Sequence, residues 1–282
     1  MRLTILGSGG CAVIPKPLCR CRICEEARAK GGPYKRTGPS AFLHDENILI
    51  DTPAEISLQL NRFRIFRVEH LILTHLDPDH VEGFRIAEQI ALDFRSWRAY
   101  PEKQIRIVLP EALHRRLRDL RGVHGPLIDF FEEQGFVRCD PFGEKTRIGE
   151  IAVTAIPVDR GALVSFIYVF EKGGRKMVYA PCDIRPFPEE RNEVQGCDLL
   201  VIQPGIFEDG LKHGFVYPRD HISRSTLYTF DETLALARRI QAPRILFVHL
   251  EEYWNRSYDD YATIEKKYDH LAFAHDGMEM LV

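Results

Sequence analysis

The sequence predicts an α+β fold, a four-layer αββα sandwich in which two β-sheets lie between helices. Hairpin-linked strands are interspersed with helical segments, without the regular repeat of a doubly wound parallel sheet. Side chains that bind metals also occur at strand ends from residue 75 to residue 249. Together these observations predict two sheets covered by helices, with a site at one edge between the sheets.

The predicted strands are short apolar runs, several of them bounded by turn residues. They cover Arg2–Leu6, Ala41–Leu43, Asn47–Ile50, His70–Leu73, Ile105–Leu109, Ile151–Pro157, Val164–Phe170, Lys176–Ala180, Leu199–Ile202, Arg244–Val248 and Met278–Val282. The predicted helices cover Val81–Leu92, Glu111–Leu120, Leu127–Gln134 and Phe230–Ile240. The last helix is the clearest, because apolar residues recur every three or four positions after a capping box at Thr229–Glu232.

Length and composition limit the organisation of the chain. No repeat, low-complexity segment or flexible linker divides the 282 residues, so a single domain over residues 1–282 is expected. The composition, 45% hydrophobic and 28% charged, excludes a disordered protein and a coiled coil. The net charge of −3 disfavours a general nucleic-acid partner.

The expected location is the cytoplasm. The N-terminus MRLTILGSGG has the pattern of a first strand rather than a signal peptide, and no apolar run approaches the ~20 residues of a membrane span. No membrane partner is therefore expected. Three of the seven cysteines, Cys19, Cys21 and Cys24, lie within six residues, which in a reducing compartment indicates metal or redox chemistry.

The segment Thr74–His80 carries the strongest chemical signal. Four potential metal ligands, His75, Asp77, Asp79 and His80, follow a predicted strand and precede a helical pattern. Imidazole and carboxylate ligands together suit Zn, Mn or Fe. The alternative is a capped helix start with surface histidines, which two His and two Asp at one turn disfavour.

A strand ending in His-x-x-x-Asp-His resembles the signature loop of the metallo-β-lactamase superfamily. The resemblance continues in chain order over nearly the whole sequence: Asp51 matches a structural Asp, Asp183 the metal-bridging Asp, His249 the last His, and Ala274–Gly277 the C-terminal end. Within the superfamily, the Gly-rich turn and the Cys cluster resemble the cyclic-phosphodiesterase branch of phosphonate breakdown. A related branch belongs to quinone-cofactor biosynthesis.

Two positions depart from the family pattern. Asp77 replaces the second His of the loop, a change that the di-iron branch also shows. The next family His should fall near residues 158–161, where Arg160 occupies the slot beside Asp159. Either Asp159 serves as an oxygen ligand, or Arg160 supplies part of the positive charge. The resemblance thus implies a metal site formed by His75, Asp77, Asp79, His80, Asp183 and His249, with Asp159 as a further candidate.

The resemblance also implies a structural zinc at the Cys cluster. Tetrahedral zinc needs a fourth ligand, and relatives use a His three residues beyond the last active-site His. That position is Glu252 here, an oxygen donor that matches thiolates less well. The alternative is a loop with free thiols.

The predicted function is metal-dependent hydrolysis of a small phosphodiester, either linear or cyclic, by hydroxide generated on the metal. Asp79, His221 and Arg160 are the expected catalytic residues. His221 lies in a segment, Asp220–Ser223, that resembles the phosphate-binding segment of relatives; the alternative is an exposed surface histidine. The alternatives are an iron-dependent redox enzyme and a non-catalytic ligand-binding member. The expected partner is a small-molecule substrate, and a homodimer is left open.

Overall fold

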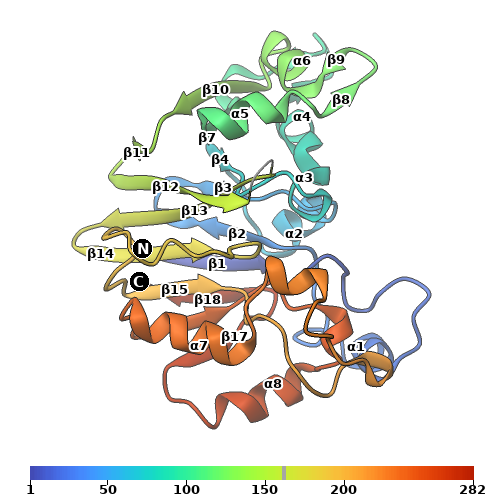
Figure 1. Ribbon diagram of the computed structural model, residues 1–282. Coiled ribbons are helices and arrows are strands. Elements are labelled where there is room, and N and C mark those ends of the chain that lie inside the picture. Colours follow the sequence, from blue (N-terminus) through green and yellow to red (C-terminus); the bar gives the residue numbers. More distant parts are fainter. Residues whose placement is uncertain (161–162) are drawn as a thin grey trace.

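The computed structural model describes residues 1–160 and 163–282. Its longer strands form two seven-stranded sheets (Figure 1), which confirms the predicted α+β sandwich. In spatial order, the first sheet consists of β10 (Val137–Phe142), β7 (Ile105–Pro110), β4 (His70–Ile72), β3 (Ile48–Ile50), β2 (Ser40–Leu43), β1 (Arg2–Gly7) and β18 (Met278–Leu281). The second consists of β11 (Lys145–Ile148), β12 (Ile151–Arg160), β13 (Leu163–Lys172), β14 (Arg175–Ala180), β15 (Leu199–Ile202), β16 (Ile245–Phe247) and β17 (Leu271–Phe273).

Side chains along the strands of the second sheet alternate between its two faces, and each face contributes to a separate core. In β13, Phe166, Tyr168 and Phe170 join the core that also contains the first sheet, whereas Ile167 and Val169 join a second core. Because successive side chains of a strand point to opposite faces, both faces of this sheet are buried. The continuous apolar runs of these strands follow from this double burial.

The helices supply the outer layers. They are α1 (Arg22–Lys30), α2 (Ile56–Arg62), α3 (Pro78–Val81), α4 (Ile86–Ala91), α5 (Glu111–Leu117), α6 (Leu127–Glu133), α7 (Phe230–Arg239) and α8 (Tyr258–Glu265). In Figure 1, α4, α5 and α6 gather at one end of the molecule, and α7, α8 and α1 at the other. Side chains of α7 and α8, such as Leu234 and Tyr261, close the second core. The predicted capping box at Thr229 is present.

Smaller elements complete the described chain. Two short hairpins pair β5 (Leu92–Asp93) with β6 (Arg98–Ala99) and β8 (Arg121–Gly122) with β9 (Gly125–Pro126). Single 3-10 turns lie at His44–Glu46, Glu82–Arg85, Pro101–Lys103, Lys212–Gly214, Ile222–Ser225 and Glu252–Trp254. Within residues 1–160 and 163–282, no helix is both long and apolar enough to cross a bilayer.

The predicted helix Val81–Leu92 is wrong as a continuous element, because it is divided into α3, the turn Glu82–Arg85 and α4. The cause is close packing against the loop after β3. Gly83 donates its N–H to the carbonyl of Thr52 at 2.8 Å, and a Cβ on Gly83 would lie 2.1 Å from the Pro53 carbonyl oxygen. Tertiary contact at Gly83 therefore overrides the local helical pattern.

Candidate metal centre and adjoining pocket

The candidate centre lies where strands of both sheets end. β3 and β4 are parallel neighbours in the first sheet, and β14, β15 and β16 are parallel neighbours in the second. The carboxyl ends of parallel strands share one edge, which is where ligands bind in many α/β sheets. Asp51, His75, Asp183 and His249 all follow such ends within three residues.

Asp51 fixes the loop from Thr74 to His80. Its carboxylate accepts hydrogen bonds from the Thr74 N–H at 2.7 Å and from the Thr74 hydroxyl, and lies 2.9 Å from Nδ1 of His80. Asp51 and His80 are fully buried. Because Nδ1 of His80 faces a carboxylate, Nε2 is the nitrogen left to bind a metal.

Three predicted ligands meet around Nε2 of His80. It lies 3.2 Å from Nε2 of His249 and 3.6 Å from Oδ2 of Asp79, while Asp79 and His249 are 3.2 Å apart. His75 lies beside them, with its ring centre 4.0 Å from that of His80. The structure thus brings together residues from position 75 to position 249.

The remaining predicted ligands differ in their placement. One ligand atom each of His75, Asp77 and Asp183 lies within 4.8 Å of the others, so these residues form a second group beside the first. The Asp77 side chain is 52% exposed, whereas that of Asp79 is 18% exposed. Asp159 is exposed at the end of β12 and belongs to neither group. The predicted role of Arg160 depends on its side chain, which lies outside the described part of the chain.

Cys182 is a site residue that the sequence analysis did not single out. Its Sγ lies 3.3 Å from Nε2 of His80 and 3.6 Å from Nε2 of His75, and all three side chains are buried. Cys182 lies directly before Asp183 and just after a predicted strand, a position that indicates a residue at the site edge. The family pattern, however, matches only Asp183.

The ionisation of the centre shows strong mutual dependence. Burial alone would lower the pKa of His75 and of His249, but Cys182 and the neighbouring carboxylates together outweigh it, and both pKa values stand well above the usual range. Burial likewise opposes ionisation of Cys182, yet the three imidazoles hold its pKa well below the usual value. The thiol and the imidazoles therefore each favour the charged form of the other, and a cation would suit the same donors.

Three site residues adopt left-handed backbone conformations. The φ angles are 62° at Asp51, 53° at Asp183 and 56° at His249. Non-glycine residues rarely adopt such angles, and they concentrate at functional sites where the surrounding structure holds them.

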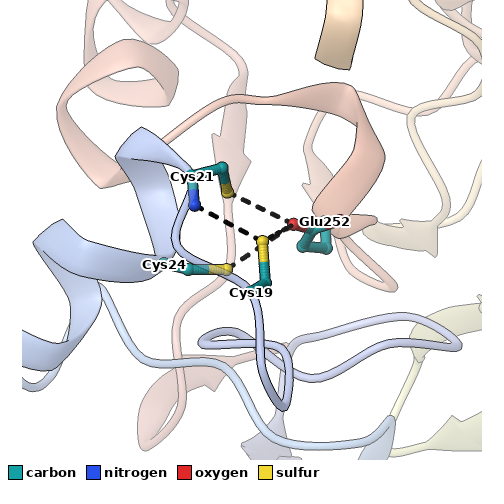
Figure 2. A group of neighbouring side chains, drawn as sticks. All are labelled: Cys19, Cys21, Cys24 and Glu252. Atoms are coloured by element: carbon teal, nitrogen blue, oxygen red, sulfur yellow. Dashed lines mark hydrogen bonds between the residues drawn. The ribbon is translucent and has the colours of Figure 1, made fainter.

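The Cys cluster forms a second candidate metal site. Oε1 of Glu252 lies 3.5, 3.4 and 3.5 Å from the sulfur atoms of Cys19, Cys21 and Cys24 (Figure 2). The structure thus places the predicted fourth residue among the three thiols. Lys212 also contacts Glu252 and donates to Cys19 at 3.1 Å, which adds a positive charge beside this acidic set.

Two hollows adjoin the centre. A cavity of about 150 Å³ is lined by His75, Asp79, Cys182, Asp183 and His249, among others. An open pocket of about 680 Å³ lies next to it, and both are lined by Cys11 and Tyr253.

His221 lines the open pocket and not the smaller cavity. Its ring packs edge to face against Tyr217, with 4.9 Å between ring centres, and its Nδ1 accepts the Ser223 N–H at 3.2 Å. The structure therefore places His221 beside the centre rather than among its ligands.

The comparisons with known proteins agree with this architecture. The family model of the β-lactamase superfamily domain matches residues 46–250. The chain therefore belongs to the β-lactamase superfamily, with the metallo-β-lactamase fold.

Two curated proteins are related in sequence. An octanoyltransferase of Porphyromonas gingivalis is 25% identical over 286 residues, which cover 100% of this chain and 52% of that protein. The chain thus spans about half the length of this relative. The coenzyme PQQ synthesis protein B of Methylobacterium radiotolerans is 25% identical over 240 residues, covering 74% of each chain.

Two solved structures share the fold over the whole chain. Zn²⁺-bound PqqB from Methylobacterium extorquens superposes with a TM-score of 0.77 at 19% identity, covering 100% of both chains. A diphosphatase of the PhnP family superposes with a TM-score of 0.72 at 20% identity, covering 100% of this chain and 97% of that one. At these identities the likeness establishes the fold alone.

Proposed function

We propose that the protein is a metal-dependent hydrolase that cleaves a phosphodiester at the centre formed by the Thr74–His80 loop, Cys182, Asp183 and His249. The observation that carries the proposal is the convergence of imidazole, thiolate and carboxylate donors at one edge of the sandwich. The superfamily membership supports hydrolysis, and the likeness to a diphosphatase supports phosphate chemistry.

The distances between donors fit a tetrahedral ion. With bonds of about 2.0–2.1 Å to nitrogen and about 2.3 Å to sulfur, tetrahedral angles separate two nitrogens by roughly 3.3 Å and nitrogen from sulfur by roughly 3.6 Å. The separation is 3.2 Å between His80 and His249, and 3.3 Å between His80 and Cys182. We assign one ion to Asp79, His80 and His249. Cys182 forms a neighbouring group with His75 and His80, and His80 is common to both groups.

The thiolate favours zinc over manganese. Soft sulfur ligands select zinc, whereas carboxylate and water ligands suit manganese. Because Cys182 adds sulfur to the imidazole and carboxylate donors of the loop, we expect the centre to prefer zinc, with iron as the alternative. The same reasoning supports zinc at Cys19, Cys21, Cys24 and Glu252, where sulfur and oxygen are about as far apart as tetrahedral geometry requires.

A bound divalent ion lowers the pKa of a water ligand and polarises the phosphoryl oxygens. The residues of the chain supply the remaining functions. The neighbouring imidazoles outweigh burial and keep the pKa of Asp79 below its usual range, so Asp79 stays ionised and can orient a water molecule. Asp183 lines the same cavity and presents a second carboxylate to the reacting group.

The two hollows would hold different parts of a substrate. The cavity of about 150 Å³ has room for a phosphate group, whereas the pocket of about 680 Å³ can hold the rest of the molecule. Since His221 and Tyr217 line the pocket, we assign them to substrate binding rather than to proton transfer. The proposed partner is a small-molecule phosphodiester.

Metal analysis combined with a phosphodiester panel tests the proposal. Purified protein should contain zinc and hydrolyse bis(4-nitrophenyl) phosphate or a cyclic phosphodiester, and His249→Ala should lose the activity. His270→Ala, at an exposed histidine outside the centre, is the matched control. Iron with oxygen consumption would support a redox enzyme instead, and an empty centre without turnover would support a ligand-binding member.

A further inference from the structure

The Gly-rich turn after β1 packs against the segment that carries His249. Gly9 pairs with Leu250 as a parallel bridge, Gly10 donates its N–H to the Leu250 carbonyl at 3.2 Å, and the Leu250 N–H donates to Ser8 at 2.9 Å. Two ends of the sequence that lie about 240 residues apart are thus joined through backbone hydrogen bonds. This pairing fixes the residues on both sides of Leu250.

The carboxylate of Glu251 occupies the space that a side chain on Gly10 would take. A Cβ on Gly10 would lie 2.3 Å from Cδ and Oε1 of Glu251, and 2.6 Å from Oε2. The backbone of Gly10 is outside the left-handed region, so an alanine there would conflict with the Glu251 carboxylate, which would have to move, and not with the backbone conformation.

Glu251 is buried and faces His249. It is 3% exposed, and its Oε1 lies 3.2 Å from Nδ1 of His249. Cys11 donates to the same carboxylate from its N–H at 3.4 Å and from its thiol at 3.3 Å. A buried carboxylate needs such partners, and His249 is the one that connects it to the metal centre.

The contact between Glu251 and Nδ1 of His249 matters because it determines which ring nitrogen of His249 carries the proton. For Nε2 to bind a metal, Nδ1 must carry the proton and donate it to an acceptor. Glu251 is such an acceptor. Gln203 also lies 3.1 Å from Nδ1 through its amide nitrogen, but an NH₂ group cannot donate to a protonated nitrogen. When Nε2 binds metal, the Gln203 amide must therefore present its oxygen or withdraw.

We propose that Glu251 is the positioning residue of His249 and that Gly10 provides the space for its carboxylate. The proposal rests on the function above, because it takes His249 as a metal ligand. It gives the Gly-rich turn a role: the turn holds Glu251 against the ring, which selects the metal-binding tautomer and orientation of His249.

Zinc affinity of the whole protein tests this, measured by competition with a chelator. The zinc equivalent that His249→Ala loses defines the centre, and the equivalent that remains reports the Cys cluster. Glu251→Ala should weaken zinc at the centre by about 10- to 100-fold, the usual cost of losing an outer-shell partner. Glu251→Gln should lose less zinc affinity at the centre, because the amide oxygen of the glutamine can still accept a hydrogen bond from Nδ1 of His249.

A double substitution separates positioning from general packing. Gly10→Ala should weaken zinc at the centre about as much as Glu251→Ala, because the new Cβ displaces the carboxylate. The Gly10→Ala/Glu251→Ala protein should bind zinc at the centre no more weakly than Glu251→Ala alone, because without the carboxylate the new Cβ meets no clash. Gly143→Ala is the matched control, because a Cβ there meets no atom within 4 Å.

Three results would overturn the proposal. Additive losses in the double variant would mean that Gly10 acts independently of Glu251, and unchanged zinc affinity in Glu251→Ala would mean that His249 needs no such support. Retention of both zinc equivalents by His249→Ala would remove the ligand assignment itself. Absence of phosphodiester hydrolysis with the expected zinc affinities would count against the proposed function and leave the positioning role supported.

Discussion

The residues of the centre are held more firmly than isolated side chains could be. Asp51, Asp183 and His249 keep left-handed φ angles that cost non-glycine residues free energy. Their neighbours hold these conformations: the Asp51 carboxylate accepts two groups of Thr74 and faces His80. The centre is therefore pre-organised, with donors already at separations suited to an ion.

At this scale, we predict that Cys182 contributes to zinc affinity. Replacing it by serine should weaken zinc at the centre by more than the ~10- to 100-fold expected for an outer-shell partner, because a direct sulfur donor is lost. A charge-transfer band of the Co²⁺-substituted centre should disappear with it. Cys139→Ser, at a partly exposed cysteine in β10, should leave both unchanged. Full zinc affinity in Cys182→Ser would exclude sulfur coordination.

The order in which metal positions fill is also set by single residues. His249→Ala should abolish metal at the centre, whereas Asp77→Ala should leave most of it, because the Asp77 side chain is 52% exposed and belongs to the group with His75 and Asp183. Metal content by mass spectrometry after dialysis checks both variants. Two equally tight ions in the unchanged centre, or an empty centre in Asp77→Ala, would contradict this order.

At the scale of elements, the site depends on where strands stop. β4 ends at Ile72 and β16 at Phe247, so the next few residues of each enter the same edge from different sheets. Tyr168 of β13 donates its hydroxyl to the Leu73 carbonyl at 2.9 Å and thereby joins the second sheet to the loop that carries His75. Each sheet contributes ligands, and the contact between sheets sets their spacing.

Strand ends were also what made the site predictable. The sequence analysis found the sheet strands with long apolar runs and the candidate ligands His75, Asp183 and His249, which follow three of them. It missed α1 and α8, because each presents only a short apolar stripe to the core. It missed Cys182 as a ligand because its proximity to His80, 102 positions away in the chain, arises only from tertiary packing.

The segment before and within α1 should depend on metal at the Cys cluster. Cys21→Ser should lower zinc content by one equivalent and increase hydrogen exchange in α1, with less effect on hydrolysis, because thiolate coordination contributes to folding locally. Unchanged zinc content would contradict coordination by Cys21. Cys197→Ser, at a buried cysteine outside the cluster, controls for loss of a thiol.

For the whole molecule, Asp276 connects both ends of the fold. It accepts hydrogen bonds from the N–H and hydroxyl of Ser8 and from the N–H and hydroxyl of Thr37, all between 2.8 and 2.9 Å. The Asp276 side chain is 1% exposed, so no water can replace these contacts readily. One carboxylate thus holds the turn after β1, the segment before β2 and the turn before β18.

Removing this carboxylate should destabilise the protein as a unit. Asp276→Ala leaves several buried donors unpaired, at about 1–3 kcal/mol for each, so the free energy of unfolding should fall by about 3 kcal/mol or more. Denaturant titration of the zinc-loaded protein measures this loss. Asp269→Ala, at an exposed aspartate, should change it by less than about 0.5 kcal/mol.

The peptide from His249 to Glu252 reaches two candidate ions at once: His249 points into the centre, and Glu252 lies among the three cysteines. Any coupling of the two affinities through this shared peptide must be reciprocal. If zinc at the cysteines tightens binding at the centre by some factor, an ion at the centre must tighten the cysteine site by that same factor. Loss of either ion would then loosen the other by that factor.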